Sequence, residues 1–405
     1  MTFTKPVLIS GGGIASLLLA STLRRSNIPF IVYERDASPI FRAQGYRLRL
    51  SNEGLDAIEK ALPPEKWETF WATCGKTGGS GLVTIDPLTG ETLSQGPDAA
   101  SRPNTGPREV LSSRDGKVVG ISRGDMRKVF MEGIEDSIRW GHHVRSYELT
   151  ADGVRAIFAD GSESEDGCLL VGGEGIYSYV AKQLSGGKLK VYDLGSRGIH
   201  GQAPTAAFKG LGEGVFRLVD EKTVPGHKIF LITNVRPQDM DDPNVQFGWT
   251  MGGSPGVVKA PNNNYTLIGK PAADIAKSLT ENWHPRFKPL FEQMNESEAA
   301  FWKITCSSPD GVPEWTNEPR VTVIGDAVHS MTPAGGIGAN TAVRDSELLG
   351  RLLAEAGEFR DGITEAYEKE MRVYASEAVK TSFNQSVGAF GTNIDLNATI
   401  EPRDV

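Results

Sequence analysis

Two carboxylates that could bind a polar ligand lie far apart in the chain. Asp326 directly follows the apolar run 321–324 and a glycine, and Glu34 ends the apolar run 30–33. A carboxylate at the tip of a buried strand can accept hydrogen bonds from a polyol. Such residues need elements that aim them at one place, and the neighbouring sequence predicts these elements.

The segment around Asp326 predicts a strand, a turn and a helix start. The β-branched run 321–324 ends at Gly325-Asp326, and a loop rich in proline and glycine leads to a helical pattern that begins near Gly338. A glycine-lined helix start offers free backbone N–H groups to an electron-rich ligand. We therefore expect a large, oriented ligand at this loop.

The amino terminus carries the matching half of such a site. A short apolar strand at 7–9 leads into the turn Gly11-x-Gly13-x-x-Ser16 and then a helix. The first glycine permits the tight turn, the second lets a pyrophosphate approach the backbone, and the third position needs a small residue. Glu34 follows within the interval of about 20 residues at which this motif places an acid on a ribose. The order predicts a dinucleotide without a 2′-phosphate, which Glu34 would repel, so FAD or NAD is favoured.

Further motifs make the chain resemble the group A flavoprotein aromatic hydroxylases, the family of para-hydroxybenzoate hydroxylase. The resemblance rests on the turn Gly11 to Ser16, Glu34-Arg35, Gly45 to Arg49, Arg123 before a helix, residues 169–180, and Gly325-Asp326 to Asn340, all in the family's order. It implies an α/β fold with a Rossmann-like FAD-binding domain of the para-hydroxybenzoate hydroxylase type, a β-sheet substrate domain and a long C-terminal helix.

The resemblance also implies which residues hold FAD. Asp326 would bind the ribityl chain, Arg123 the phosphates or ribityl chain, and the loop after Pro333 would lie beside the flavin pyrimidine. The complete implied set is Gly11, Gly13, Ser16, Glu34, Arg35, Gly45, Arg123, Glu174, Asp326, Pro333, Gly336, Gly338, Ala339 and Asn340. The chain has Glu174 where the family carries aspartate and Ala181 where it usually has arginine, and these departures concern the nicotinamide step more than FAD.

The segments between the motifs predict two interleaved domains. We expect a discontinuous FAD-binding domain at 1–75, 112–182 and 318–385, and a substrate-binding domain at 76–111 and 183–317. A hairpin is expected at 83–93, and short β-rich runs recur from 188 to 251, including 205–208. Helical patterns follow at 125–138, 272–282, 287–294 and 363–385, and residues 386–405 suggest an irregular tail.

The implied reaction uses NAD(P)H and molecular oxygen. The reduced flavin would form a 4a-hydroperoxyflavin that hydroxylates or epoxidises an electron-rich aromatic molecule, phenolic or indole-like, of secondary metabolism. The protein must then exclude water from the site. His329 beside Asp326 is expected to be a packing or hydrogen-bonding residue rather than a base.

Substrate contacts are expected from the predicted sheet, where only alternate side chains can face the flavin. The pocket candidates are Arg47, Arg49, Arg217, His227 and Trp249, with Tyr192, His200, Phe208, Phe216, Phe230 and Phe247 as further aromatic or basic candidates. Arg47 and Arg49 share one strand face, and a surface location explains them as well as a pocket does. A cation or base that favours phenolate could be Arg217, His200 or His227.

Composition restricts the remaining classes. The 405 residues are 39% hydrophobic and 23% charged, an ordinary globular composition, and the net charge of -8 argues against a nucleic-acid surface. Three separated cysteines predict neither a disulfide scaffold nor a dithiol site. We expect no metal, signal peptide or transmembrane anchor, and a cytoplasmic location.

A second class of function stays open from the sequence. Ser16, Glu174 and Ala181 depart from the family pattern, as they would in a protein that keeps the fold but acts as a non-redox cyclase, isomerase or small-molecule binder. Absence of a Trp-x-Trp segment argues against a flavin halogenase.

Overall fold

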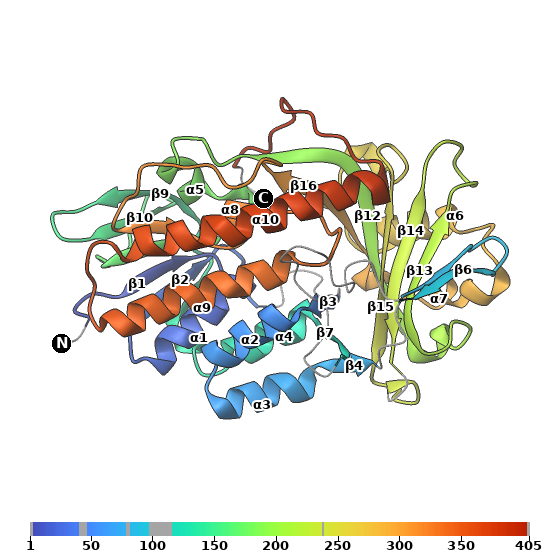
Figure 1. The fold of residues 1–405 in the computed structure, drawn as a ribbon, viewed down its shortest axis with the longest axis horizontal. Coiled ribbons are helices and arrows are strands. Elements are labelled where there is room, and N and C mark those ends of the chain that lie inside the picture. Colours follow the sequence, from blue (N-terminus) through green and yellow to red (C-terminus); the bar gives the residue numbers. More distant parts are fainter. Residues whose placement is uncertain (1–2, 40–46, 78–81, 97–115, 237–238, 403–405) are drawn as a thin grey trace.

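A parallel sheet of five strands lies at the centre of one half of the molecule, which is called the first half below (Figure 1). The computed structural model describes residues 3–39, 47–77, 82–96, 116–236 and 239–402. The strand order is β17-β11-β1-β2-β8, with bounds β1 Val7–Ser10, β2 Phe30–Glu34, β8 Ile138–Trp140, β11 Leu169–Gly172 and β17 Val321–Val323. Val7, Leu8 and Ile9 are fully buried because helices or strands cover both faces, as all-parallel sheets require.

Long helices cover this sheet and connect it to the rest of the chain. Helix α9 packs against α1, α2 and α10. The helices of this half are α1 Ile14–Arg25, α2 Asn52–Ala61, α3 Pro64–Thr73, α4 Arg123–Met131, α5 Tyr179–Leu184, α8 Asp326–His329, α9 Gly338–Ala356 and α10 Ile363–Phe390. Helix α10, red in Figure 1, begins over the parallel sheet and reaches the second sheet with its C-terminal end.

The second sheet has seven strands in the order β16-β12-β15-β14-β13-β5-β6. Its members are β5 Leu82–Ile85, β6 Thr92–Gly96, β12 Val191–Pro204, β13 Gly214–Asp220, β14 Ile229–Val235, β15 Gln246–Gly253 and β16 Ala300–Ser307. One face packs on α6 Lys270–Leu279 and α7 Pro289–Glu292 through buried Phe216, Phe247 and Trp249. Because side chains alternate along a strand, the intervening residues point to the opposite face, toward the first half of the molecule.

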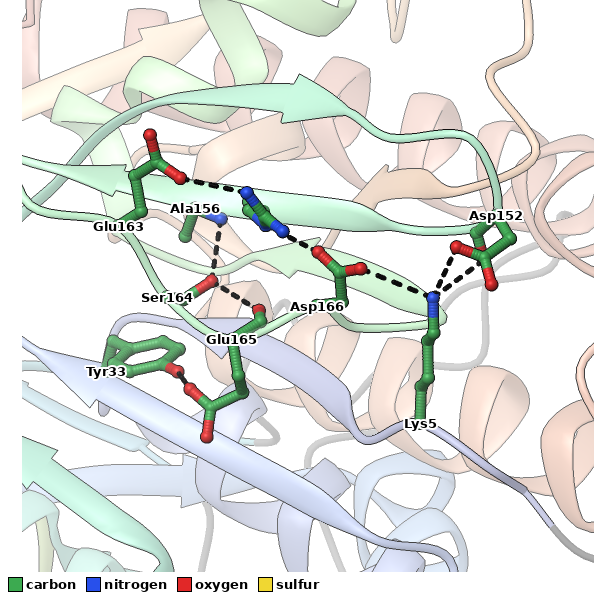
Figure 2. A network of polar contacts seen from close by, with 9 residues as sticks. Lys5, Tyr33, Asp152, Ala156, Glu163, Ser164, Glu165 and Asp166 are labelled. Carbon is green, nitrogen blue, oxygen red and sulfur yellow. Dashed lines mark hydrogen bonds and ion pairs between the residues drawn. The ribbon is translucent and has the colours of Figure 1, made fainter.

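Two smaller sheets and a network of polar contacts accompany the parallel sheet. Strands β3 Arg47–Leu50, β7 Val118–Ser122 and β4 Gly75–Thr77 form a three-stranded sheet, and β9 Val144–Leu149 pairs with β10 Val154–Phe158. Figure 2 shows how Lys5, before β1, pairs with Asp152 at 2.6 Å and Asp166 at 3.4 Å. The Tyr33 hydroxyl donates to Glu165 in the same network. The network thus joins the β9–β10 hairpin to the strands that end at the glycine turn.

The predicted fold class and the long C-terminal helix are confirmed, with local differences. The helix expected at 125–138 stops at Met131, and residues 205–208 form a 3-10 turn rather than a strand. The C-terminal helix continues past 385 to Phe390, and the tail then returns to pair Thr399 with Tyr192 of β12. Strand β16 was not expected. The two-domain division remains a proposal.

In the described ranges, no helix combines the length and the apolarity that a bilayer crossing needs. Within the same ranges, no group of three or more histidine, cysteine or acidic side chains is arranged to hold a metal ion.

Candidate active site

A cavity of about 1600 Å³ lies between the two sheets. The glycine turn after β1, the end of β2, the start of α4, the turn after β11 and the loop before α9 line one side. Strands of the seven-stranded sheet line the other side, and the C-terminal part of α10 also contributes lining residues. The cavity therefore joins the motifs from both ends of the chain to the sheet that was expected to bind substrate.

The first glycine turn is shaped by a close backbone approach. Gly11 has φ +92°, donates its N–H to the Tyr33 carbonyl at 2.7 Å, and would place a Cβ only 2.6 Å from the Gly173 oxygen. Gly13 is the N-cap of α1 and no side chain caps this helix, so its first N–H groups can serve a ligand in the cavity. Ser16 lies beneath the turn, fully buried against Gly173, and does not line the cavity.

The carboxylate of Glu34 binds the backbone of the same turn. Its Oε2 accepts from the Gly12 N–H at 2.5 Å and its Oε1 from the Asp36 N–H at 2.9 Å. Arg35 also lines the cavity. Arg127, which the sequence analysis missed, is 4% exposed and donates Nε–H to the Gly12 carbonyl at 3.2 Å. It lies one helical turn after Arg123 on the buried face of α4, and this spacing could have identified it.

Asp326 is open to the cavity at the start of α8, with Arg123 on the facing helix. Burial by the surrounding protein raises the pKa of Asp326, and the charges of His329 and Arg123 partly oppose this rise. The preceding Gly325 has φ +64°, which lets the chain leave β17 and enter α8 within two residues.

The loop before α9 and the first turn of that helix reach the cavity through four of the five residues predicted there: Pro333, Gly336, Gly338 and Ala339. Asn340 is the exception, because its fully buried side chain points behind the loop. Its Oδ1 accepts from the Ser51 N–H at 2.8 Å, and its Nδ2 donates to the carbonyls of Arg49 and Gly336, both at 3.0 Å. The geometry assigns Asn340 to positioning the loop rather than to direct flavin contact.

The carboxylate of Glu174, in the segment 169–180, has a partner within its own turn. Glu174 lines the cavity, but its Oε2 accepts from the Ser178 hydroxyl at 2.7 Å, and burial raises its pKa. Ala181 is 3% exposed in α5, where the Ser178 Oγ caps its N–H. The structure thus gives Glu174 a local partner in its own turn.

Asp345 of α9 forms a buried network beneath Asp326 that the sequence analysis missed. The fully buried Asp345 carboxylate accepts from the Gly325 N–H, the His329 Nε2 and the Tyr374 hydroxyl, each at 2.7 Å. Burial alone would lower the pKa of His329, but the charge and hydrogen bond of Asp345 outweigh it and raise that pKa. His329 is therefore a hydrogen-bonding residue, as expected, and it fixes α8 to α9.

The sheet side of the cavity holds only some of the predicted substrate residues. His200, Arg217 and Phe230 of the seven-stranded sheet line the cavity, and so does Arg49 from β3 of the three-stranded sheet. Trp249 is wrong as a pocket residue, since alternation places it on the opposite face, where it is 2% exposed and donates to the Leu290 carbonyl. His227 is also wrong, because it lies exposed in the turn between β13 and β14.

Further candidates lie away from the cavity. The residues Tyr192, Phe208, Phe216 and Phe247 are buried in apolar clusters and do not line it. Gly45 lies outside the described residues, and so does the side chain of Arg47. Trp302 of β16 lines the cavity and was missed together with its strand.

This fold and cavity fit a flavoprotein that binds FAD. The chain belongs to the FAD binding domain family, whose model matches residues 4–382. The predicted resemblance and the FAD cofactor are confirmed.

Curated relatives of the chain are described as FAD-dependent monooxygenases. The dual O-methyltransferase/FAD-dependent monooxygenase elcB of Phaeosphaeria nodorum is 30% identical over 443 residues, which cover 95% of this chain and 46% of elcB. CTB3 of Cercospora beticola, with the same description, is 30% identical over 87% of this chain and 42% of its own length. The chain spans about half the length of these two relatives. The FAD-dependent monooxygenase thnD of Trichoderma harzianum is 26% identical, with 94% and 87% covered.

Solved structures share the fold. A candidate FAD-containing monooxygenase from Photorhabdus luminescens superposes with a TM-score of 0.73 at 25% identity, covering 95% of this chain and 98% of that one. HpxO of Klebsiella pneumoniae, solved with FAD and uric acid, gives a TM-score of 0.69 at 20% identity over 95% and 88% of the two chains. The latter likeness concerns the fold alone.

Proposed function

We propose that the protein uses NAD(P)H and O2 to insert one oxygen atom into an electron-rich aromatic molecule. The observation that carries this proposal is the single cavity that connects the uncapped N-termini of α1 and α9, with Glu34 and Asp326, to the face of the seven-stranded sheet. In the balanced reaction NAD(P)H supplies two electrons, one oxygen atom enters the substrate, and the other leaves as water.

The chain's own residues fit FAD. The N–H groups of the first turn of α1 suit the pyrophosphate, and Glu34 suits a ribose. Asp326, held at the cavity wall, suits the ribityl hydroxyls. The start of α9 can stabilise negative charge on the flavin pyrimidine. Bound FAD supplies the redox chemistry and the activation of oxygen, while the protein orients both reactants and excludes water.

Arg217 is the group we assign to a phenolate or another acidic substituent of the substrate. Burial lowers the pKa of His200 to about 3, so this imidazole is neutral and adds no positive charge. His227 lies outside the cavity, so of the three candidates Arg217 is the cation that lines it.

A first experiment tests the activity itself. The purified protein is expected to be yellow, to release FAD on denaturation, and to oxidise NADPH faster when a substrate is present, with one atom from ¹⁸O2 in the product. A colourless protein that takes up no FAD would instead support the non-redox cyclase or binder, which the family relationship does not favour.

Asp326→Ala is expected to weaken FAD binding by about ten- to a hundredfold, because it removes a charged acceptor of the ribityl hydroxyls. Fluorescence quenching during titration of the apoprotein with FAD measures this loss. Asp310→Ala, which removes an exposed acid, is the matched control and should bind FAD normally. Normal binding by Asp326→Ala would contradict the assignment.

A further inference from the structure

The sheet wall of the cavity contains a row of two aromatic residues separated by two glycines. Cross-strand pairing places Trp302 of β16, Gly198 of β12, Gly252 of β15 and Phe230 of β14 directly beside one another. A Cβ on Gly198 would lie 2.2 Å from the Trp302 ring, and one on Gly252 would lie 2.3 Å from the Phe230 ring. Each aromatic ring therefore lies over its neighbouring glycine.

This arrangement departs from the usual geometry of a sheet, in which side chains stand roughly perpendicular to it. Rings that lie over glycines leave a low, flat surface instead of two projections into the cavity. Phe230 is covered in turn by Phe390, the last residue of α10, with ring centroids 4.4 Å apart and planes inclined by 22°. Trp302 is only half-buried and lines the cavity, so it is the ring that can accept a ligand.

A second row, two residues further along the strands, is polar at its ends. It runs from His200 through Thr250 and Ile232 to Arg217. The His200 ring lies beside Trp302 at 5.5 Å and 24°, and its Nδ1 lies 2.9 Å from the Thr250 hydroxyl. Between this pair and Arg217 the floor consists of Thr250 and the aliphatic Ile232, without an ionised group.

The guanidinium of Arg217 has an incomplete set of partners. It donates to the Thr84 hydroxyl at 3.3 Å, and its buried Nε has no hydrogen-bond partner. Among the described residues, no carboxylate forms an ion pair with it. A charge on a cavity wall in this state favours an anionic group of a ligand.

The distance between these features sets the size of the ligand. The Trp302 ring covers β12, whereas the Arg217 guanidinium leans away toward Thr84 on β5. Strands β12, β15, β14 and β13 are consecutive, so three intervals separate the two features. At about 4.8 Å an interval this is roughly 14 Å, far more than one six-membered ring spans.

We propose that this wall selects a planar substrate of two or more fused aromatic rings, stacked on Trp302 and bearing an oxyanion that pairs with Arg217. The inference rests on the proposed function and names the substrate class of that site. Trp302 and Arg217 determine specificity by binding opposite ends of one molecule.

Three probes separate the two contacts in the FAD-bound protein, with affinity read from the change in flavin absorbance. At alkaline pH, 1,8-dihydroxyanthraquinone offers fused rings and an oxyanion, anthraquinone offers the rings alone, and salicylate offers one ring with an anion. The first probe is expected to bind at least about tenfold more tightly than either of the others. Salicylate binding as tightly as the dihydroxyanthraquinone would overturn the proposal.

Variants assign each contact to its residue. Trp302→Leu should weaken both three-ring probes about tenfold and leave salicylate unchanged, whereas Trp302→Phe, which keeps a ring, should recover part of the loss. Arg217→Met should weaken the two anionic probes by about tenfold or more and leave anthraquinone unchanged. Trp71→Leu in α3 controls for the loss of a half-buried tryptophan elsewhere and should change no affinity.

The proposed function and this inference fail in different ways. If the protein binds FAD and oxidises NADPH, but Trp302→Leu leaves the affinity for all three probes unchanged, only the substrate inference is wrong. If the protein takes up no FAD, the proposed function is wrong as well. FAD content and thermal unfolding are measured on each variant, so misfolding is recognised directly, and Trp302→Phe then serves as the test of the ring.

Discussion

Gly11→Ala is expected to reduce FAD affinity by at least about a hundredfold, because two independent costs meet at this position. A Cβ would lie 2.6 Å from the Gly173 oxygen, and the φ of +92° is strained for any residue with a side chain, by about 1–2 kcal/mol. Backbone atoms cannot yield to this contact as a flexible side chain would. The turn must therefore move away from the pyrophosphate position. Its N–H groups would then no longer converge on the pyrophosphate, and FAD would bind more weakly.

Titration of the apoprotein with FAD measures this loss, and thermal unfolding of the apoprotein shows whether the fold persists. Gly161→Ala is a matched control, since Gly161 has a φ of +83° with no atom within 4 Å of the added Cβ. It carries the same backbone strain without the steric contact. If Gly11→Ala bound FAD as well as Gly161→Ala did, the close approach to Gly173 would have no part in shaping the site.

The sequence predicted the two ends of the site because their signals are local. A strand, a glycine-containing turn and a helix start follow one another at residues 7–16, and again at residues 321–338. Each signal depends on backbone geometry within a few residues, and the structure brings both to one cavity. The same locality explains why the fold class could be predicted.

The sheet wall could be predicted much less well. Alternation shows that half of the residues in a strand face the flavin, but register decides which half. Trp249 and Arg217 were equally plausible until pairing placed Trp249 against α7 and Arg217 in the cavity. The flat ring of Trp302 depends on Gly198, a neighbour about 100 residues away in sequence, so no local pattern contains it.

Asp345 and Asn340 are a third case. The local sequence marks each residue as unusual, but it does not show which groups the side chain contacts. Asp345 falls on the buried face of α9 with Ala342 and Leu349, and a carboxylate within an apolar stripe requires partners. Asn340 belongs to the glycine loop by sequence, yet its amide is used entirely by the backbone of β3, Ser51 and the loop itself. Polar residues beneath a ligand loop thus position it without touching the ligand.

Asp345→Asn is expected to lower the free energy of unfolding by about 3–5 kcal/mol near pH 6, as removal of one partner from a buried ion pair does. The asparagine keeps the size of the side chain but brings an amide N–H₂ toward groups that are themselves donors: the Gly325 N–H, His329 and the Tyr374 hydroxyl. Because Gly325 precedes Asp326, the variant should also bind FAD more weakly. Urea unfolding and FAD titration measure the two effects.

The stability difference between Asp345→Asn and the wild type should depend on pH in a direction that His329 fixes. In the wild type the pKa of His329 is raised above its ordinary value near 6.5, so the protonated pair stabilises the fold fully below that pH. This contribution is lost as pH rises through the raised pKa, and the difference between wild type and variant should shrink accordingly. Asp361→Asn, at an exposed acid between α9 and α10, should show no such trend. A difference that stayed constant from mildly acidic to alkaline pH would mean that His329 does not change its protonation state in this range, and would contradict the predicted trend.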